Sequence, residues 1–431
     1  MFRLSLAAAL SFGLVTVACT TGTDESTEPA PASVSTTSLA TTTSIVTTTT
    51  STTTSTTSTT TTTTVPPDVV AIENVLSRLD DRSLAQQLVI FGAAGSVSDG
   101  LLNAVGSVCV GGVFVTDSSQ NWSPISSPDA ASSAITELRR AADACAVAPF
   151  VATDAEPGTQ VLRVPVTPLP GATTLEANHM AEPGTTTVGL APSAQAFAAE
   201  LSDLGVDVNF GVVADVDVGD RFYMARQNRS FGANPDVVGA ITAALVEGHC
   251  AAGVAPTLKH FPNQGSTPED PHLADSFSAN SPAEWRDFGA MPYEATSAPL
   301  VMVGHIRYPD VDDGVPAVFS STIVNGWLRQ DLGYRGVVVT DDLLAMRGVG
   351  ADLGVPDRAL AALRAGADLA LFVDARGGEA IIDAIVAAMA NDPAFASTVR
   401  ASAERILRLK GALGLLPEAD PAWFALCDPG R

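Results

Sequence analysis

The stretch that decides the fold runs from Gly336 to Leu343 and reads Gly-Val-Val-Val-Thr-Asp-Asp-Leu. A run of valines is typical of a buried strand, and two carboxylates at its end would be costly to bury unless they faced an open mouth. Only one of them can face that mouth, because neighbouring strand residues point to opposite sides. We expect Asp341 to take that place and Asp342 to cap a following helix.

Seven further runs of β-branched or apolar residues recur along the chain, and stretches with helical periodicity separate them. The eight runs are Leu88–Phe91, Gly111–Val115, Phe150–Asp154, Val206–Phe210, Thr257–Phe261, Leu300–His305, Gly336–Asp341 and Leu369–Val373. The helix candidates are Ser127–Ala144, Ala191–Leu204, Pro235–Ala252, Ser321–Leu332 and Pro356–Ala365. Strands that alternate with helices imply parallel pairing, and eight such units predict one (β/α)8 barrel of the TIM type. A doubly wound open sheet is the alternative.

Polar residues stand at the ends of four of these runs: Asp154, the pair Lys259-His260, His305 and Asp341. Barrel enzymes place their chemistry at the carboxyl ends of the strands, where side chains converge on one mouth. Four polar ends in one chain therefore predict a site at that mouth.

The densest group of polar residues follows the fifth run. Residues 259–265 read Lys-His-Phe-Pro-Asn-Gln-Gly, and residues 270–272 read Asp-Pro-His. Proline and glycine favour a long loop after the strand. Asp270 and His272 are two residues apart, so in an extended segment both point the same way. A carboxylate beside an imidazole sets its tautomer and suits it to proton transfer near neutral pH. Without its position after the Lys259-His260 strand, an Asp-x-His pair would more often belong to a solvated loop that has no catalytic role.

Together, the Lys-His-Phe-Pro segment with Asp-x-His downstream and the Thr-Asp-Asp-Leu after a valine strand resemble the bacterial β-N-acetylhexosaminidases of glycoside hydrolase family 3. The resemblance runs from about Leu84 to Leu415 and includes Leu-Ala-Gln-Gln-Leu at residues 84–88 and Arg-Ile-Leu-Arg-Leu at residues 405–409. The loop motif is specific to this branch of the family. It implies a retaining exo-glycosidase that releases terminal β-N-acetylglucosamine, with peptidoglycan fragments or related amino-sugar chains as substrates.

The resemblance also implies roles for individual residues. It makes Asp341 the nucleophile, His272 the acid/base and Asp270 the partner of His272. Arg163 stands one residue out of register with the family motif. The residues implied to hold the sugar are Asp154, Arg163, Arg229, Lys259 and His260.

Two residues depart from the family pattern. Gln264 stands where the family has a second histidine, and Pro271 replaces a common serine and removes an N–H donor. A stiffer loop would bring His272 to the sugar more slowly, so a catalytically weak wall-binding lipoprotein is one alternative. Two others are a β-glucosidase of the same family and a phosphorylase, because a neutral imidazole does not repel phosphate.

Two segments precede the folded part. Residues 1–19 carry one positive charge at Arg3, then an apolar run too short to span a bilayer, and end in Val-Ala-Cys. That order predicts a secretory signal of the lipoprotein type, in which an acylated Cys19 anchors the chain to the outer face of the membrane. Secretion without an anchor is the alternative. Residues 20–67 are almost entirely Thr, Ser, Ala and Pro, which predicts a disordered stalk. The barrel then spans residues 68–431.

Four cysteines remain after Cys19. Outside the cytoplasm an even number can pair, although free thiols are the alternative. Cys109 and Cys145 are the expected pair, because each lies near neighbouring strands on the amino-terminal side of the barrel, which leaves Cys250 and Cys427 for each other. No spacing suggests a metal, and we expect no cofactor. The net charge of −24 argues against nucleic acid as a partner. We expect a monomer that binds carbohydrate.

Overall fold

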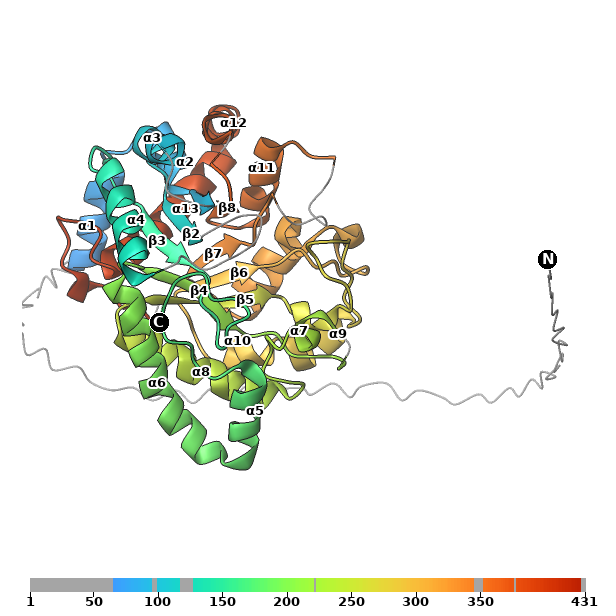
Figure 1. The fold of residues 1–431 in the computed structure, drawn as a ribbon. Helices are drawn as coiled ribbons and strands as arrows, with labels where there is room; N and C mark the ends of the chain where they lie inside the picture. Colours follow the sequence, from blue (N-terminus) through green and yellow to red (C-terminus); the bar gives the residue numbers. More distant parts are fainter. Residues whose placement is uncertain are drawn as a thin grey trace, which may run out of the picture. The chain divides into compact units, whose positions relative to one another are not determined.

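Eight parallel strands form the centre of the structure, a computed structural model that describes residues 65–94, 99–116, 127–220, 222–344, 352–375 and 377–427. The strands are β1 (Val89–Ala94), β2 (Gly112–Thr116), β3 (Phe150–Thr153), β4 (Val208–Val213), β5 (Ala255–Phe261), β6 (Leu300–Val303), β7 (Val337–Thr340) and β8 (Ala370–Phe372). They pair in the order β7-β6-β5-β4-β3-β2-β1-β8. A parallel bridge between Val339 and Leu369 brings the β8 side back to β7. The sheet closes on itself, which confirms the predicted (β/α)8 barrel (Figure 1).

Helices surround the barrel on its outer side (Figure 1). The α-helices of the described residues are α1 (Pro67–Leu76), α2 (Asp81–Gln87), α3 (Asp99–Val108), α4 (Pro128–Ala141), α5 (Ala172–Ala181), α6 (Pro183–Asp203), α7 (Tyr223–Arg226), α8 (Pro235–Ala251), α9 (Pro282–Glu284), α10 (Met291–Ala295), α11 (Val355–Ala365), α12 (Gly378–Asn391) and α13 (Pro393–Ala412). The described residues also contain two π-helices, η2 (Trp285–Gly289) and η5 (Thr322–Asp331). Short 3-10 helices are η1 (Gln264–Ser266), η3 (Asp312–Gly314), η4 (Ala317–Phe319) and η6 (Pro421–Trp423).

Several helices begin where the sequence carries a capping residue followed by proline. Ser127 accepts a backbone hydrogen bond before Pro128 in α4, and Asn234 does the same before Pro235 in α8. The side chain satisfies an N–H that the helix leaves unpaired, and proline has no N–H to lose at that position. These signals set the helices that position strands β3 and β5.

All eight predicted runs form strands, and the differences lie at their ends. β3, β6 and β7 stop before Asp154, His305 and Asp341, so these polar residues follow their strands instead of ending them. The predicted helix at Ser321–Leu332 is the π-helix η5. Its apolar face is buried except for Leu332, which is half-buried.

The expected role of Asp342 as a helix cap stays a prediction, because residues 345–351 lie outside the described residues. The next helix among the described residues, α11, begins after Gly354. The Oδ1 atom of Asp342 accepts the N–H groups of Leu344 and Val373, at 3.0 and 3.1 Å. Asp342 therefore holds the turn after β7 against the end of β8, which keeps the neighbouring Asp341 in place.

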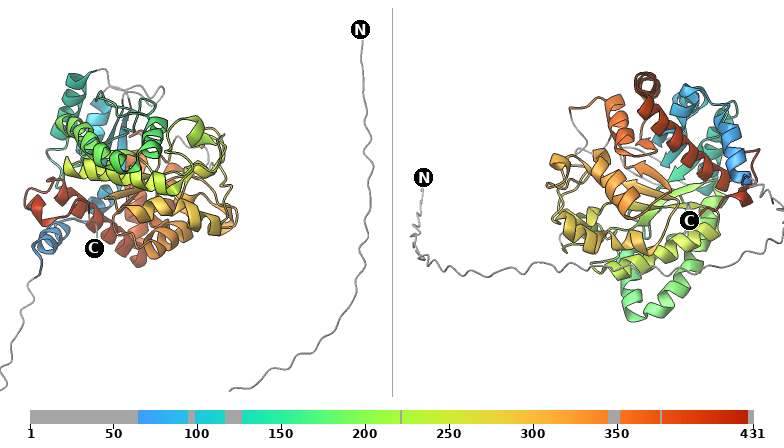
Figure 2. Two further views of the ribbon diagram at one scale, coloured as in Figure 1. Left: turned by 90° about the horizontal axis from the view of Figure 1, so that it is seen from below. Right: turned by 180° about the vertical axis from the view of Figure 1, so that it is seen from behind.

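Two disulfides and the packing of the first described helices against the last ones complete the barrel. Cys109 pairs with Cys145 and Cys250 with Cys427, with Cα–Cα distances of 5.4 and 6.1 Å, as predicted. Helices α1 and α2 pack beside α12 and α13, so the first and last parts of the barrel lie side by side (Figure 2).

The predicted signal at residues 1–19, including Cys19, and residues 20–64 of the predicted stalk lie outside the described residues. In the ranges that the structure describes, no helix is both long and apolar enough to cross a membrane.

Candidate active site

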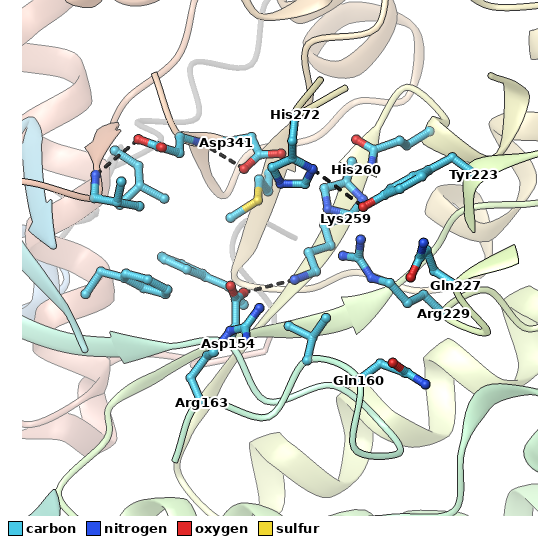
Figure 3. Close-up of a pocket in the computed structure, with 18 of the residues that line it drawn as sticks. Asp154, Gln160, Arg163, Tyr223, Gln227, Arg229, Lys259, His260, His272 and Asp341 are labelled. Carbon is cyan, nitrogen blue, oxygen red and sulfur yellow. Dashed lines mark hydrogen bonds and ion pairs between the residues drawn. The ribbon is translucent and has the colours of Figure 1, made fainter. Parts of the chain in front are cut away.

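A cavity of about 370 Å³ opens at the carboxyl ends of the strands (Figure 3). Apolar side chains line part of it: Phe114, Val161, Phe210, Met302, Leu371 and Val373. The polar lining residues are Asp154, Gln160, Arg163, Tyr223, Gln227, Arg229, Lys259, His260, Gln264, Asp270, His272, Asp341 and Asp342. The structure thus brings together all eight residues that the sequence predicted for the site. A concave site with an apolar wall and convergent polar groups is typical of small-ligand binding.

Asp341 lies directly after β7, and its backbone N–H donates a hydrogen bond to the end of β6. Burial alone would raise the pKa of Asp341, but the imidazoles of His260, His305 and His272 together hold it below its usual value of 3.8. The carboxylate is therefore ionised near neutral pH. An ionised carboxylate that faces a cavity is able to act as a nucleophile.

Asp270 and His272 form a close pair on the loop after β5. The Oδ1 atom of Asp270 lies 2.8 Å from Nδ1 of His272 and accepts the backbone N–H of the same residue at 2.9 Å. Because Nδ1 faces the carboxylate, Nε2 is the ring nitrogen left for proton exchange with a ligand. The two side chains are 29% and 38% exposed, so the pair stands at the edge of the cavity and not beneath it.

Five charged side chains form a largely buried cluster on the opposite side of the cavity: Asp154, Glu156, Arg163, Arg229 and Lys259. Nζ of Lys259 lies 2.9 Å from Oδ1 of Asp154 and 2.7 Å from Oε1 of Glu156. Arg229 donates two hydrogen bonds to the carboxylate of Glu156, at 2.9 and 2.8 Å. Burial would raise the pKa of Glu156, but Arg229 and Lys259 lower it to about 2. Such paired geometry is what makes buried charge tolerable.

The cations of this cluster keep their charge. Burial would lower the pKa of Lys259, and the carboxylates of Asp154 and Glu156 raise it above its usual value. Arg163 lies beside Asp154 in Figure 3 and donates its backbone N–H to the carbonyl oxygen of Asp154 at 2.9 Å. Burial lowers the pKa of Arg163, and the same two carboxylates oppose that shift. The cluster offers N–H donors and carboxylate acceptors, the two kinds of group that sugar hydroxyls need.

His260 is oriented from behind by Asp215. Nδ1 of His260 lies 2.8 Å from Oδ2 of Asp215, whose side chain is fully buried. Oδ1 of the same carboxylate accepts the backbone N–H groups of His260 and Gln264, at 3.2 and 2.6 Å. One buried carboxylate therefore sets both the ring tautomer and the path of the backbone after β5.

Glu156 and Asp215 are site residues that the sequence analysis did not identify. Glu156 is two residues after Asp154, so alternation along an extended segment was an available signal. Asp215 lies two residues beyond β4, which ends at Val213, whereas the predicted run stopped at Phe210. Ending the run too early removed Asp215 from the set of polar residues at strand ends.

A second supporting residue lies behind the Asp154–Glu156 segment. The amide of Asn209 in β4 accepts the N–H of Ala155 at 3.0 Å and donates to its carbonyl oxygen at 2.9 Å. The same amide nitrogen lies 2.9 Å from Nε2 of His249 in α8. Gly211 permits this close approach, because a Cβ there would collide with the carbonyl oxygen of Ala155.

His305, the polar residue at the end of the sixth predicted run, occupies a different environment from His272. It is buried, it is not among the lining residues of the cavity, and its Nε2 lies 3.0 Å from the carbonyl oxygen of Asp342. Burial lowers its pKa to about 4, with Asp341 acting in the opposite direction. A neutral imidazole whose Nε2–H already serves a carbonyl oxygen is poorly placed to protonate a ligand.

The two residues that depart from the family pattern, Pro271 and Gln264, do not break the hydrogen bonds of Asp270 and Asp215 described above. Pro271 contributes no N–H, but the Asp270–His272 pair uses the N–H of His272. Gln264 is buried and lines the cavity, and its backbone N–H is one of the groups that Asp215 accepts. Among the described residues, no group of three or more His, Cys, Asp or Glu side chains is arranged to hold a metal ion.

Comparison with known proteins also points to a glycoside hydrolase. The model of the glycosyl hydrolase family 3 N terminal domain matches residues 82–409. A beta-hexosaminidase of Stenotrophomonas maltophilia is 36% identical over 242 residues, which are 55% of this chain and 71% of that protein. The beta-hexosaminidase LpqI of Mycobacterium tuberculosis is 34% identical over 221 residues, 49% of this chain and 56% of that protein.

A solved structure covers more of the chain. The β-N-acetylhexosaminidase of Beutenbergia cavernae superposes with a TM-score of 0.69 at 30% identity and covers 77% of this chain and 99% of its own. The family model spans most of the chain, and the barrel, the strand-end carboxylates and the Asp-x-His loop lie within it. The chain therefore belongs to glycosyl hydrolase family 3.

Proposed function

We propose that this protein is a retaining exo-β-N-acetylhexosaminidase that hydrolyses terminal β-N-acetylglucosaminides. The observation that carries the proposal is that an ionised Asp341 and the Asp270–His272 pair line one cavity. Retaining hydrolysis needs one nucleophilic carboxylate and one proton donor at the same glycosidic bond. Relatives named beta-hexosaminidase and a structure named β-N-acetylhexosaminidase support the choice of sugar.

The proposed reaction has two steps. Asp341 forms a bond to the anomeric carbon while the bond to the leaving oxygen breaks and His272 gives that oxygen a proton. Water then attacks the glycosyl ester, His272 takes a proton from it, and Asp341 leaves as a carboxylate. Two inversions at the same carbon give net retention of configuration.

The buried charged cluster is proposed to hold the terminal sugar during both steps. Asp154 offers acceptors, and Lys259, Arg229 and Arg163 offer donors, all facing the cavity. His260, set in place by Asp215, adds a further group at the carboxyl end of β5. Groups that are already paired and buried need little reorganisation when a sugar binds, which favours tight positioning.

The substrates are proposed to be peptidoglycan fragments or related amino-sugar chains outside the cytoplasm, reached by a lipoprotein anchored at Cys19. Two disulfides in the described residues support an oxidising compartment. Labelling with a radioactive fatty acid would test the anchor, because a Cys19→Ser variant should lose the label. Light scattering would test the proposed monomer.

An aryl β-N-acetylglucosaminide tests the function directly. We expect release of the aryl group, with product of retained configuration detected by NMR immediately after mixing. Faster turnover with inorganic phosphate and formation of a sugar 1-phosphate would make the protein a phosphorylase. Preference for an aryl β-glucoside would make it a β-glucosidase, and no turnover of either substrate would leave a binding protein.

A further inference from the structure

The short helix α7 lies against the start of the loop that carries Asp270 and His272. The backbone N–H of Tyr223 donates to the carbonyl oxygen of Thr267 at 3.0 Å. One helical turn later, Nη1 of Arg226 donates to the carbonyl oxygen of Pro268 at 2.9 Å. Two consecutive carbonyl groups at the base of this loop are therefore held by one helix.

The side chain of Tyr223 reaches the other part of the same loop. Its hydroxyl oxygen lies 3.5 Å from Nδ1 of His272, and the two ring centroids are 6.3 Å apart with an angle of 56° between the planes. Figure 3 shows the hydroxyl between the imidazole of His272 and the guanidinium of Arg229. Tyr223 is only 6% exposed, so its ring is a firm surface beside a more exposed histidine.

The hydroxyl is neutral in this position. Burial raises the pKa of Tyr223, while the nearby Arg229 acts in the opposite direction. Nδ1 of His272 already faces Asp270 at 2.8 Å, so the more distant hydroxyl is a second and weaker partner. Its main effect is on ring orientation: a turn of the imidazole away from Asp270 would also have to leave Tyr223.

We propose that Tyr223 is a positioning residue for the proton-transfer step and that α7 is the platform on which the His272 loop docks. Tyr223 links the sugar-binding cluster, through Arg229, to the Asp270–His272 pair. This inference rests on the proposed hydrolysis. It assigns Tyr223 an effect on how well His272 is aimed, and none on sugar affinity.

The test compares Tyr223→Phe with the wild-type protein on two kinds of β-N-acetylglucosaminide. Alkyl or disaccharide substrates have poor leaving groups and need protonation, whereas activated aryl substrates need little. We expect kcat/KM to fall about tenfold on the first kind, equivalent to about 1.4 kcal/mol, and less than about threefold on the second.

Two further variants separate positioning from simple packing. Arg226→Met removes the contact to Pro268 and should give the same leaving-group dependence with a smaller loss. Tyr293→Phe is the matched control: that hydroxyl is buried outside the cavity, with no hydrogen-bond partner among the described residues, and its loss should change nothing.

Three results would overturn the inference. They are equal losses on both substrate kinds, a raised KM with unchanged kcat, and wild-type behaviour of Tyr223→Phe on every substrate. The first two would place Tyr223 among the sugar-binding groups. Failure of the proposed function is separate, because the wild-type protein itself would then show no turnover of any β-N-acetylglucosaminide.

Discussion

At the scale of single residues, the adjacent carboxylates Asp341 and Asp342 have different contacts and therefore different roles. Asp341 lines the cavity among three imidazoles, while Asp342 accepts the N–H groups of Leu344 and Val373. Both carboxylates line the cavity, and they differ in the groups that surround them. The two residues therefore make a matched pair for mutation.

We expect Asp341→Asn to abolish turnover, with a loss of at least about a thousandfold in kcat, because an amide does not form the glycosyl ester. Asp342→Asn should keep most of the activity, since its amide oxygen still accepts backbone N–H groups, and it should unfold at a lower temperature. Steady-state kinetics and thermal unfolding measure both. Wild-type rates in Asp341→Asn, or a reversal of the two phenotypes, would move the nucleophile to Asp342.

His272→Ala should slow substrates with poor leaving groups by orders of magnitude and activated aryl substrates much less in the first step. The reason is that only the former need a proton when the bond breaks. A plot of kcat/KM against the pKa of the leaving group measures the difference, and its slope should steepen in the variant. Equal losses across the series would mean that His272 only binds sugar. His305 would be the next residue to test, although its Nε2 faces a carbonyl oxygen.

At the scale of elements, the sequence predicts the strands well and their support poorly. The valine run before Asp341 and the strand that ends in Lys259-His260 can be predicted from the sequence, because a buried strand leaves a local pattern of apolar residues. Asn209 leaves no such pattern, since it meets the backbone of Ala155 from β4. Asp215 follows β4, and its pairing with His260 at the end of β5 also joins separate segments. Contacts between segments far apart in the chain depend on closure of the barrel, which no local signal encodes.

The amide of Asn209 supplies a prediction at this scale. Asn209→Ala would free both backbone groups of Ala155, and the flanking Asp154 and Glu156 would lose their common support. We expect KM to rise about tenfold or more, because each unmade buried hydrogen bond costs about 1–3 kcal/mol. Kinetics on an aryl substrate measure it, and Asn325→Ala is the control, since that amide meets the carbonyl oxygen of Ala365 away from the cavity.

His249 offers an independent check on the same support. Burial lowers its pKa to about 4, so near neutral pH it is neutral and its Nε2 is able to accept from Asn209. A His249→Leu variant should show the same rise in KM in weaker form. An unchanged KM in both variants would mean that the Asp154–Glu156 segment needs no help from β4.

At the scale of the whole molecule, the closure of the barrel joins the two ends of the described chain. Arg408 in α13 pairs with Asp68 in α1 at 2.7 Å, and the Cys250–Cys427 disulfide ties the last described residue to α8. The chain has only two lysines, and both are buried: Lys259 in the cavity and Lys410 in α13. The surroundings of Lys259 raise its pKa above the usual value, whereas those of Lys410 lower its pKa.

Lys410 gives the last prediction. Its Nζ donates to Oε1 of Gln87 at 2.6 Å and lies 6.0 Å from the ring centroid of Phe150. Burial lowers the pKa of Lys410 from 10.5 to about 7, and Asp207 opposes the shift. Below pH 7 the amine is charged in both the folded and the unfolded chain. Between about pH 7 and 10.5 only the unfolded chain keeps the proton, so unfolding takes one up and stability from this group rises with pH.

Relative to Lys410→Met, the wild-type protein should therefore gain up to about 1.4 kcal/mol of unfolding free energy per pH unit over that window. Urea unfolding of both proteins at several pH values measures the difference, and the slope is the quantity of interest because the methionine also leaves Gln87 without its donor. Gln87→Leu is the control: it removes the same hydrogen bond but keeps the amine, so its slope should match that of the wild type. Parallel curves for wild type and Lys410→Met would show that Lys410 stays charged in the fold, with Asp207 near enough to outweigh its burial.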